Sequence, residues 1–279
     1  MNIVIGSRGR LGSAIAASLG NGRTLTPTRS VYAEWSEEDG ADAVFRYVAE
    51  HSQRDDVVYM AAGLIDTSAA PEEHLRVNFR IPRNIIVGAS RANVRVVTFG
   101  TIMERFIGDA GANPYISAKT KLGKFVSAYA ASGHDILHVR LHTLFGGGTP
   151  HDFMFLGQIF NALKNRSLFR MSSGTQLREY HHIDDDVAAT RELVSAGLRG
   201  VVDLSHGQPI SLRDLASHIF EACDCLDLLR IGALPSPASD NYEITLERTP
   251  ALRQFEFQDT LPAVVSYLRD CLDSSRNRR

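Results

Sequence analysis

The sequence contains few cysteines, and none of them has the spacing of a metal site. The three cysteines, Cys223, Cys225 and Cys271, form no C-x-x-C motif. A small, odd count argues against a disulfide framework and favours reduced thiols in a cytoplasmic protein. His181 and His182 are adjacent, and neighbours in a strand point to opposite faces, so this pair is poorly placed to share one ion. We therefore expect no metal.

The chain also lacks a long apolar run and a strong net charge. No stretch approaches the roughly 20 apolar residues that span a bilayer, and the first residues lack the basic start and apolar core of a signal peptide. The formal net charge is -2 over 279 residues, so no overall field favours nucleic acid or a membrane surface. These absences predict a cytoplasmic protein that binds neither nucleic acid nor a membrane.

A glycine-rich loop follows the first apolar run. Residues 2–5 are typical of a buried strand, and the residues after the loop are typical of a helix. Glycines at i, i+3 and i+6 let the backbone approach a pyrophosphate, and the helix N-terminus offers free N–H groups. The order of strand, loop and helix favours dinucleotide binding over a tight turn without a ligand. The expected cofactor residues are Gly6, Ser7, Arg8, Gly9, Arg10, Leu11 and Gly12.

The residues after the second strand-like run indicate which dinucleotide binds. That run, residues 23–28, ends at Arg29, and no acidic residue occurs between positions 21 and 32. At this place an acid suits the ribose 2′-hydroxyl of NAD, whereas an arginine suits the 2′-phosphate of NADP. Together with Arg8 and Arg10, Arg29 favours NADPH, with NAD as the alternative. The structural alternative is that these arginines are solvated surface charges.

Tyr115 and Lys119 are four residues apart and directly follow Pro114. Proline suits the first turn of a helix, because its missing N–H would have no partner there. In a helix that begins at Pro114, the two side chains lie on one face. An ammonium beside a phenol lowers the phenol pKa toward working pH, which suits proton exchange with a carbonyl/alcohol pair. Spacing alone is weak support, since many surface helices have such a pair.

Three motifs together resemble the extended short-chain dehydrogenase/reductases, the NAD-dependent epimerase/dehydratase family. The glycines at 6–12 have the spacing G-x-x-G-x-x-G, and Tyr115 and Lys119 follow in the expected order. The run at 175–187 is similar to the family pattern G-x-x-x-R-[DE]-[FY]-x-x-[IV]-x-D-[IV]. The resemblance implies an α/β fold with a Rossmann-like, doubly wound parallel sheet and a smaller C-terminal substrate-binding lobe.

The same resemblance implies how the chain divides. We expect a dinucleotide-binding Rossmann domain at residues 1–145, to which residues 179–205 return. The glycine-rich break that begins at Gly146 is expected to open the small nucleotide-sugar-binding lobe, formed by residues 146–178 and 206–279. Family members often dimerise, so a homodimer is consistent with this reading.

The resemblance also implies roles for residues near the ends of predicted strands. Thr101 would hydrogen-bond the reacting oxygen and complete the catalytic trio with Tyr115 and Lys119. Ala61 and Ala62 are small residues after another predicted strand and would lie against the cofactor.

Substrate contacts follow from the same comparison. Arg178 stands where the family has the arginine that grips the diphosphate of a nucleotide sugar, and a guanidinium fork suits that task. The alternative is a surface arginine paired with a nearby acid. Met103 and Thr143 are expected beside the sugar. Thr143 replaces the asparagine of the family signature R-x-x-N-x-Y-G, which puts the usual contact of that asparagine in question.

Departures from the family narrow the reaction. Ile102 and Met103 occupy the places where the 4,6-dehydratases have an Asp-Glu pair. Met103 also stands where the epimerase-reductase that forms GDP-fucose has a catalytic cysteine. Two reactions therefore remain as candidates for this chain: the reduction of a carbonyl, and 4-epimerisation through a transient ketone.

The expected NADPH preference favours reduction. The sequence therefore predicts NADPH-dependent reduction of the 4-keto group of a nucleotide-linked 4-keto-6-deoxyhexose or dideoxyhexose, in deoxysugar biosynthesis, similar to CDP-abequose and CDP-paratose synthases. One alternative is a nucleotide-sugar 4-epimerase with bound NAD. A non-catalytic NADP-binding sensor is the other, and the retained Tyr115 argues against it.

Overall fold

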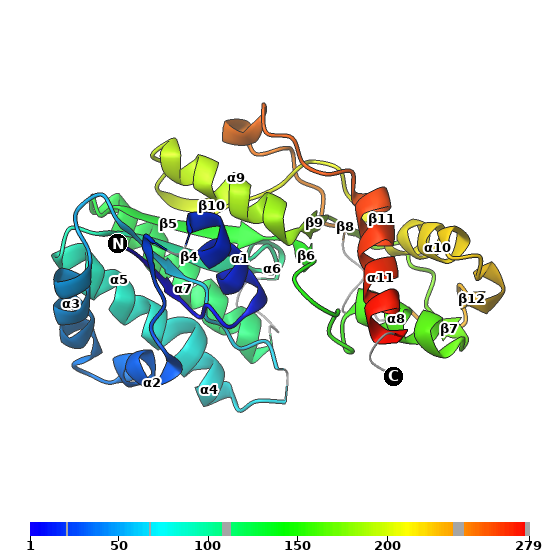
Figure 1. The fold of residues 1–279 in the computed structure, drawn as a ribbon, viewed down its shortest axis with the longest axis horizontal. Helices are drawn as coiled ribbons and strands as arrows, with labels where there is room; N and C mark the ends of the chain where they lie inside the picture. The colour runs from blue at the N-terminus through cyan, green and yellow to red at the C-terminus, as the bar shows by residue number, and fades with distance from the viewer. Residues whose placement is uncertain (21, 67, 108–112, 237–242, 277–279) are drawn as a thin grey trace. The chain divides into compact units, whose positions relative to one another are not determined.

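The computed structural model describes residues 1–276 except residues 21, 67, 108–112 and 237–242 (Figure 1). The chain forms two compact units, and each has its own apolar core. The sheet unit consists of Met1–Leu141 and Val187–Leu204, and the second unit consists of His142–Asp186 and Ser205–Arg279. The domain boundaries predicted from the sequence stay a prediction.

The sheet unit is built on six parallel strands in the order β10-β5-β4-β3-β1-β2. β3 is buried along its whole length, as expected of a strand covered by helices on both faces. The predicted α/β fold with a Rossmann-like parallel sheet is confirmed. The strands are β1 (Asn2–Ile5), β2 (Thr24–Leu25), β3 (Val57–Met60), β4 (Arg95–Thr101), β5 (Ile136–Leu141) and β10 (Gly200–Asp203).

Helices cover both faces of this sheet (Figure 1). α1 and α9 lie on one face, where Arg191 of α9 donates to the Ser18 carbonyl of α1 at 3.1 Å. α3, α5 and α7 lie on the other face. The helices are α1 (Arg10–Leu19), α2 (Arg29–Tyr32), α3 (Gly40–His51), α4 (Pro71–Leu75), α5 (Ile81–Arg91), α6 (Met103–Phe106), α7 (Pro114–Ala131) and α9 (Ile183–Ser195), with a 3₁₀ turn at Ala33–Ser36.

The strand order reverses direction between β1 and β3. From β1 the chain moves outward to β2, and then crosses back to β3 on the other side of β1. Open α/β sheets bind ligands at such a reversal, beyond the carboxyl ends of the strands. Gly6 follows β1 and Ala62 follows β3, and a Cβ at Gly6 would lie 2.4 Å from the Ala62 nitrogen. The glycine loop therefore lies at the point where ligands bind in this class of fold.

The sequence of residues 72–92 is typical of one helix, but the structure does not form one regular helix there. α4 and α5 are joined by a π-helical turn at Arg76–Arg80. Pro82, in the first turn of α5, has no N–H for the regular i→i−4 bond, and π turns accommodate such local breaks. The turn contains the buried Asn78, whose side chain bonds the backbone N–H and C=O of Leu64 at 3.0 and 2.9 Å.

The second unit packs helices against short strand pairs. Three strand pairs form among the described residues: β6 with β9, β8 with β11 and β7 with β12. The α10 N-terminus is capped by Ser211, which accepts from the Asp214 N–H at 3.1 Å, as its sequence predicts. The elements are β6 (Thr143–Phe145), α8 (Phe155–Asn165), β7 (Phe169–Arg170), β8 (Leu177–Arg178), β9 (Tyr180–His182), β11 (Ile210–Ser211), α10 (Leu212–Ala222), β12 (Leu229–Arg230) and α11 (Thr260–Arg276), with 3₁₀ turns at Leu226–Leu228 and Pro250–Leu252.

The core of the second unit comes from the inner faces of its helices. Ile159 and Phe160 of α8, Ile219 of α10 and Leu268 of α11 are buried in one cluster. Among the helices that the structure describes, none is both long enough and apolar enough to cross a bilayer.

Candidate active site

The glycine loop is shaped by close backbone packing. Gly6 has φ +85°, in the region that favours glycine. The Gly9 N–H donates to the Gly6 carbonyl at 2.9 Å, and a Cβ at Gly12 would lie 2.2 Å from the Gly6 oxygen. Gly9 is the N-cap of α1 and offers no side-chain cap. This geometry brings bare backbone to the start of a helix, where anions bind.

The arginine expected at the ribose lies at the start of α2 and is largely exposed. The Arg29 guanidinium is 3.9 Å from the Glu73 carboxylate, and its side chain is 73% exposed. Glu73 bonds Arg76 more closely, at 2.6 Å, so the Arg29 pair is the weaker of the two. Arg8 is exposed in the glycine loop. The positions of Arg8 and Arg29 are compatible with phosphate binding and with solvated surface charge.

Thr101 lies at the carboxyl end of β4 and its surroundings hold it firmly. Its N–H donates to the Glu104 carboxylate at 2.8 Å, and its hydroxyl oxygen accepts from the Met103 N–H at 3.3 Å. A hydroxyl that accepts one bond still has its own proton to donate. The Thr101 hydroxyl can therefore donate a hydrogen bond to another oxygen.

Tyr115 and Lys119 lie in the first turns of α7, as predicted. Asn113 caps this helix by accepting from the Ile116 N–H at 2.9 Å, and Pro114 occupies its first turn. Lys119 is buried, and its ammonium donates to the Phe99 carbonyl of β4 at 2.7 Å. The helix thus ties the predicted lysine to the strand that ends at Thr101.

The electrostatics of the pair differ from the prediction. The pKa of Tyr115 is raised, because burial disfavours the phenolate and the Glu104 carboxylate opposes a second negative charge. Burial lowers the pKa of Lys119 to about 8, and Glu104 opposes this fall. The prediction that Lys119 lowers the Tyr115 pKa toward working pH is wrong for this arrangement, in which the phenol keeps its proton.

A glycine and an asparagine lie near the Lys119 ammonium. A Cβ at Gly63 would lie 3.5 Å from the Asn78 amide oxygen and 3.9 Å from the Lys119 nitrogen. The buried His74 bonds Asn78 at 3.3 Å, and its ring centre lies 6.4 Å from that of Tyr115. α4 and the π-helical turn therefore place polar groups beside the predicted catalytic pair.

Two buried residues of this neighbourhood escaped the sequence analysis. Glu104 lies one turn beyond Thr101, and His138 of β5 is 3.2 Å from its carboxylate. Both are buried. A single acid in a short helix gives no periodic signal of burial. The available signal was Gly100 near the end of an apolar strand, since glycine inside a strand often marks a close approach.

The predicted substrate residues Arg178 and Thr143 lie in the second unit. Arg178 is half-buried on β8, opposite Ile210 of β11, and its guanidinium donates to the Leu177 carbonyl at 2.8 Å. Thr143 begins β6, and its N–H donates to the Glu179 carbonyl at 3.2 Å. Ala61 and Ala62 follow β3 in the sheet unit, where the Ala61 N–H bonds the Ile5 carbonyl at 2.9 Å.

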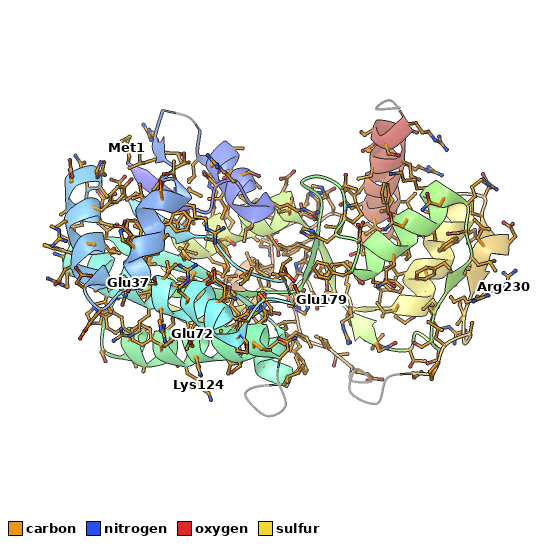
Figure 2. All side chains as sticks on the ribbon, turned by 90° about the horizontal axis from the view of Figure 1, so that it is seen from below. Met1, Glu37, Glu72, Lys124, Glu179 and Arg230 are labelled. Carbon is orange, nitrogen blue, oxygen red and sulfur yellow. The ribbon has the colours of Figure 1, made fainter. Side chains whose placement is uncertain are left out.

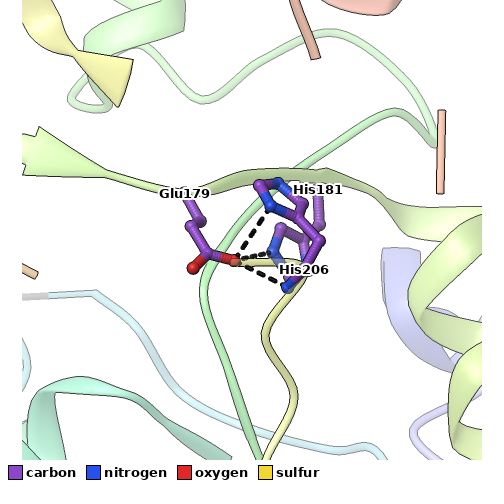
Figure 3. Close-up of side chains that lie close together, drawn as sticks. All are labelled: Glu179, His181 and His206. Carbon is purple, nitrogen blue, oxygen red and sulfur yellow. Dashed lines mark hydrogen bonds and ion pairs between the residues drawn. The ribbon is translucent and has the colours of Figure 1, made fainter. Parts of the chain in front are cut away.

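A buried cluster of titratable side chains lies in the second unit, around Glu179 (Figure 3). Glu179 Oε2 is 2.9 Å from His181 Nε2 and 3.2 Å from His206 Nδ1. The other ring nitrogen of His181 is 2.7 Å from Asp186 Oδ1. Glu179 also accepts from the Ser205 hydroxyl at 2.6 Å. Figure 2 shows Glu179 inside the chain, unlike the exposed Glu37, Glu72 and Lys124.

Opposite charges hold this cluster together. Burial would lower the pKa of His181, but Asp186 and Glu179 raise it to about 9. Burial would raise the pKa of Glu179, but the hydrogen bond from His181 and the neighbouring groups lower it to about 2. An imidazolium at His181 beside the Glu179 carboxylate is therefore the form that the surroundings favour, while burial raises the pKa of Asp186.

Among the described residues, one set of metal-ligating side chains lies close together, and it belongs to this cluster. One atom each from Glu179, His181 and His206 lies within 4.8 Å of the others. The hydrogen bonds of His181 to two carboxylates already occupy both of its ring nitrogens. The absence of a metal stays a prediction. His182 belongs to a different set of contacts, with Phe145 and Asp184.

Comparison with known proteins identifies a family model and solved structures that are similar to this chain. Residues 2–202 match the profile of the NAD dependent epimerase/dehydratase family. No curated protein matches the sequence.

Solved structures match it over nearly the whole length. MoeE5 in complex with UDP-glucose and NAD has 20% identity, covers 99% of each chain and has a TM-score of 0.75. The UDP-N-acetylglucosamine 4-epimerase of Methanobrevibacter ruminantium M1 has 15% identity and a TM-score of 0.78, covering 100% of this chain and 99% of its own. The dTDP-4-dehydrorhamnose reductase of Bacillus anthracis, solved with NADP, has 17% identity and a TM-score of 0.72, covering 97% and 99%. At these identities the likeness establishes the fold.

Proposed function

Because the chain belongs to the NAD dependent epimerase/dehydratase family, we propose that it reduces the 4-keto group of a nucleotide-linked 4-keto-6-deoxyhexose with NADPH. The protonation of Tyr115 supports this most directly. Burial and the Glu104 carboxylate raise its pKa, so the phenol keeps its proton. Lys119, with a pKa of about 8, is largely charged at neutral pH. A protonated phenol beside an ammonium is suited to donate a proton to a ketone that is being reduced.

The glycine loop fits a dinucleotide, since Gly6 and Gly12 allow the loop at the start of α1 to pack closely on its own backbone and on Ala62. When bound, NADPH supplies the hydride that reduces the sugar carbon. A reductase of the same fold was solved with NADP. We assign the pyrophosphate to Gly6, Ser7, Arg8, Gly9, Arg10, Leu11 and Gly12, the 2′-phosphate to Arg29, and contacts along the cofactor to Ala61 and Ala62.

In this proposal Tyr115 donates its phenolic proton to the oxygen at C4 as negative charge develops there. Thr101 donates a hydrogen bond from its hydroxyl to the same oxygen and keeps its proton, while its own oxygen accepts from the Met103 N–H. Donors aimed at a developing charge stabilise the transition state. Lys119, anchored on the Phe99 carbonyl, provides positive charge near the phenol and binds the nicotinamide ribose.

Arg178 on β8 is assigned to the diphosphate of the substrate, as a planar guanidinium pairs well with phosphate oxygens. Binding energy at the diphosphate orients the sugar at a distance from C4. Met103 and Thr143 are assigned to the sugar. Ile102 and Met103 have no acid or base, so elimination of water is not expected at this site.

The alternative function is a nucleotide-sugar 4-epimerase with bound NAD. The fold alone is compatible with it, because an epimerase and a reductase are both similar to this chain. The two functions differ in their use of reductant. An epimerase would retain NAD on purification and interconvert sugars without consuming NADPH. The alternative of a non-catalytic NADP-binding sensor is less favoured, because a sensor has no need of the catalytic tyrosine and this chain retains Tyr115.

The test is NADPH oxidation with 4-keto-6-deoxysugars carried on CDP, dTDP, GDP and UDP. The wild-type protein should consume NADPH with at least one of them, and Tyr115→Phe should lose activity roughly a hundredfold or more. Tyr129→Phe is the matched control, since Tyr129 lies on the same helix and stacks on Phe125 and His134. Equal turnover by Tyr115→Phe, or sugar interconversion without loss of NADPH, would contradict the proposal.

A further inference from the structure

A chain of polar side chains runs beneath Thr101 inside the sheet unit. Glu104 of α6 has a side chain that is only 3% exposed. One carboxylate oxygen accepts from the Thr101 N–H at 2.8 Å, and the other is 3.2 Å from His138 Nε2. The second ring nitrogen of His138 is 2.8 Å from the Thr98 hydroxyl. The carboxylate is therefore bonded on both sides, to β4 and to β5.

Two glycines leave the space that this carboxylate fills. A Cβ at Gly100 of β4 would lie 2.1 Å from one oxygen of Glu104, and a Cβ at Gly123 of α7 would lie 2.6 Å from the other. Gly123 is one helical turn beyond Lys119 and shares its face of α7. The strand and the helix thus approach each other around Glu104, on the side of α7 that bears Lys119.

The charged and titratable groups around this point come from each packed element. α7 contributes Tyr115 and Lys119, and both respond to the charge of Glu104, which raises their pKa values. β5 contributes His138. Arg105, next to Glu104 in the chain, is instead paired with Asp203 at 2.6 Å. The segment from α4 to the π-helical turn contributes His74, beside Tyr115, and Asn78, near Lys119.

We propose that the Glu104 carboxylate, enclosed by Gly100 and Gly123, is a positioning group that fixes the backbone of Thr101 and serves as the buried counter-charge of Lys119. A carboxylate removed from water is costly unless hydrogen bonds and an opposite charge stabilise it. Thr101 and His138 provide the hydrogen bonds, and Lys119 provides the charge. This inference rests on the proposed function, in which protonated Lys119 and Tyr115 serve the reduction of a ketone.

The first test follows Lys119 directly and requires no substrate. The chain has only four lysines, Lys119, Lys121, Lys124 and Lys164, so NMR of the protein labelled at the lysine ε-carbon gives few signals. The Lys119 signal is the one that Lys119→Arg removes, and we expect it to titrate near pH 8. Glu104→Gln keeps an acceptor for Thr101 but removes the charge, and should lower this midpoint by about one unit or more. An unchanged midpoint would overturn the proposal.

Two further variants make the result specific. Glu50→Gln changes an exposed acid of α3 and should leave the Lys119 midpoint unchanged. Glu104→Asp withdraws the carboxylate by one methylene, so the midpoint should fall less than in Glu104→Gln. If Glu104→Gln does not fold, Glu104→Asp decides the question, and a wild-type midpoint with wild-type kcat in that variant would overturn the inference.

The second test is kinetic and separates this inference from the proposed function. Loss of Glu104 should lower kcat for ketone reduction roughly ten- to a hundredfold through misplacement of Thr101, with little change in KM for NADPH. The fall in rate at alkaline pH should also move to lower pH. A wild-type protein that reduces no keto sugar would refute the proposed function, whereas the NMR titration would still decide the role of Glu104.

Discussion

Tyr115 keeps its proton because its surroundings disfavour a phenolate, through desolvation and through the charge of Glu104, which both raise its pKa. The protonated phenol is the form that can give a proton to a developing alkoxide, whereas the oxidation of an alcohol begins with a base. Lys119, with a pKa of about 8, loses its charge at mildly alkaline pH. The proposed reduction should therefore proceed at neutral pH and weaken as the pH rises through the Lys119 pKa.

Arg29 is the residue on which the proposed cofactor choice depends. Its side chain is 73% exposed and only loosely paired with Glu73, at 3.9 Å, which leaves it available to a phosphate. Arg29→Ala should raise KM for NADPH by roughly ten- to a hundredfold, as expected for loss of a charge-assisted hydrogen bond. KM for NADH should change little. Steady-state kinetics with both cofactors measures the ratio of KM for NADPH to KM for NADH in each protein.

Arg46→Ala is the control for this prediction, because Arg46 is an exposed arginine of α3 in the same unit. It should leave both KM values near those of the wild-type protein. If Arg29→Ala changes KM equally for NADPH and NADH, Arg29 does not read the 2′-phosphate.

The loop between β1 and α1 is an element in which the backbone itself is the proposed ligand. A methyl group at Gly12 would lie 2.2 Å from the Gly6 oxygen and 2.7 Å from the Gly6 carbonyl carbon. Both atoms are backbone, so the loop must move. Gly12→Ala should therefore raise Kd for NADPH roughly tenfold or more, since overpacking of this kind costs about 1–3 kcal/mol. Titration of cofactor fluorescence checks this.

Gly22→Ala is the matched substitution, as a Cβ at Gly22 meets nothing within 4 Å. Its Kd for NADPH should match the wild-type value. A Gly12→Ala protein that binds NADPH normally would show that the loop does not require glycine at this position.

Regular elements were the part of the fold that the sequence specified most clearly. β1 and β3 are short apolar runs bounded by glycine or small residues, a pattern typical of buried parallel strands. α7 begins at Pro114 because proline and a capping asparagine are local signals. The prediction of one helix at 72–92 did not include the π-helical turn. One proline, Pro82, changes the hydrogen bonding of the backbone without changing the apolar pattern of the sequence.

Interactions between distant residues were not accessible to the same reasoning. Glu104 and His138 are 34 positions apart, and Glu179 and His206 are 27 positions apart. Spacing along an element indicates which face a residue occupies, but it does not indicate which partner lies opposite. For that reason the raised pKa of Tyr115, which depends on burial and on Glu104, was also missed.

The buried cluster around Glu179 links the stability of the whole molecule to pH. The pKa of His181 is raised from 6.5 to about 9, so its stabilisation is complete below pH 6.5 and is lost as the pH rises through 9. The pKa of Glu179 is lowered from 4.5 to about 2, so its stabilisation is lost as the pH falls toward 2. Burial lowers the pKa of His206 to about 4 and of His142 to about 3, which also costs stability below pH 6.5.

Urea unfolding at a series of pH values should therefore show greatest stability near neutral pH. His181→Gln should be less stable than the wild-type protein at neutral pH and should lose the decline between pH 6.5 and 9. His151→Gln, at an exposed position, is the control and should keep that decline. An unchanged alkaline decline in His181→Gln would show that this histidine is not its source.

The return of the chain to the sheet has a consequence for biosynthesis. β10 pairs with β5, and its Asp203 lies 2.7 Å from Arg140. While a ribosome makes residues 142–199, the outer edge of β5 has no neighbouring strand, and an open edge of buried apolar residues is a template for aggregation. A nascent chain released before β10 should therefore self-associate. Sedimentation of a chain that ends at Ser195, beside the full-length protein, tests this, and equal solubility would contradict it. Efficient expression should accordingly depend on chaperones that shield β5 until translation passes Asp203.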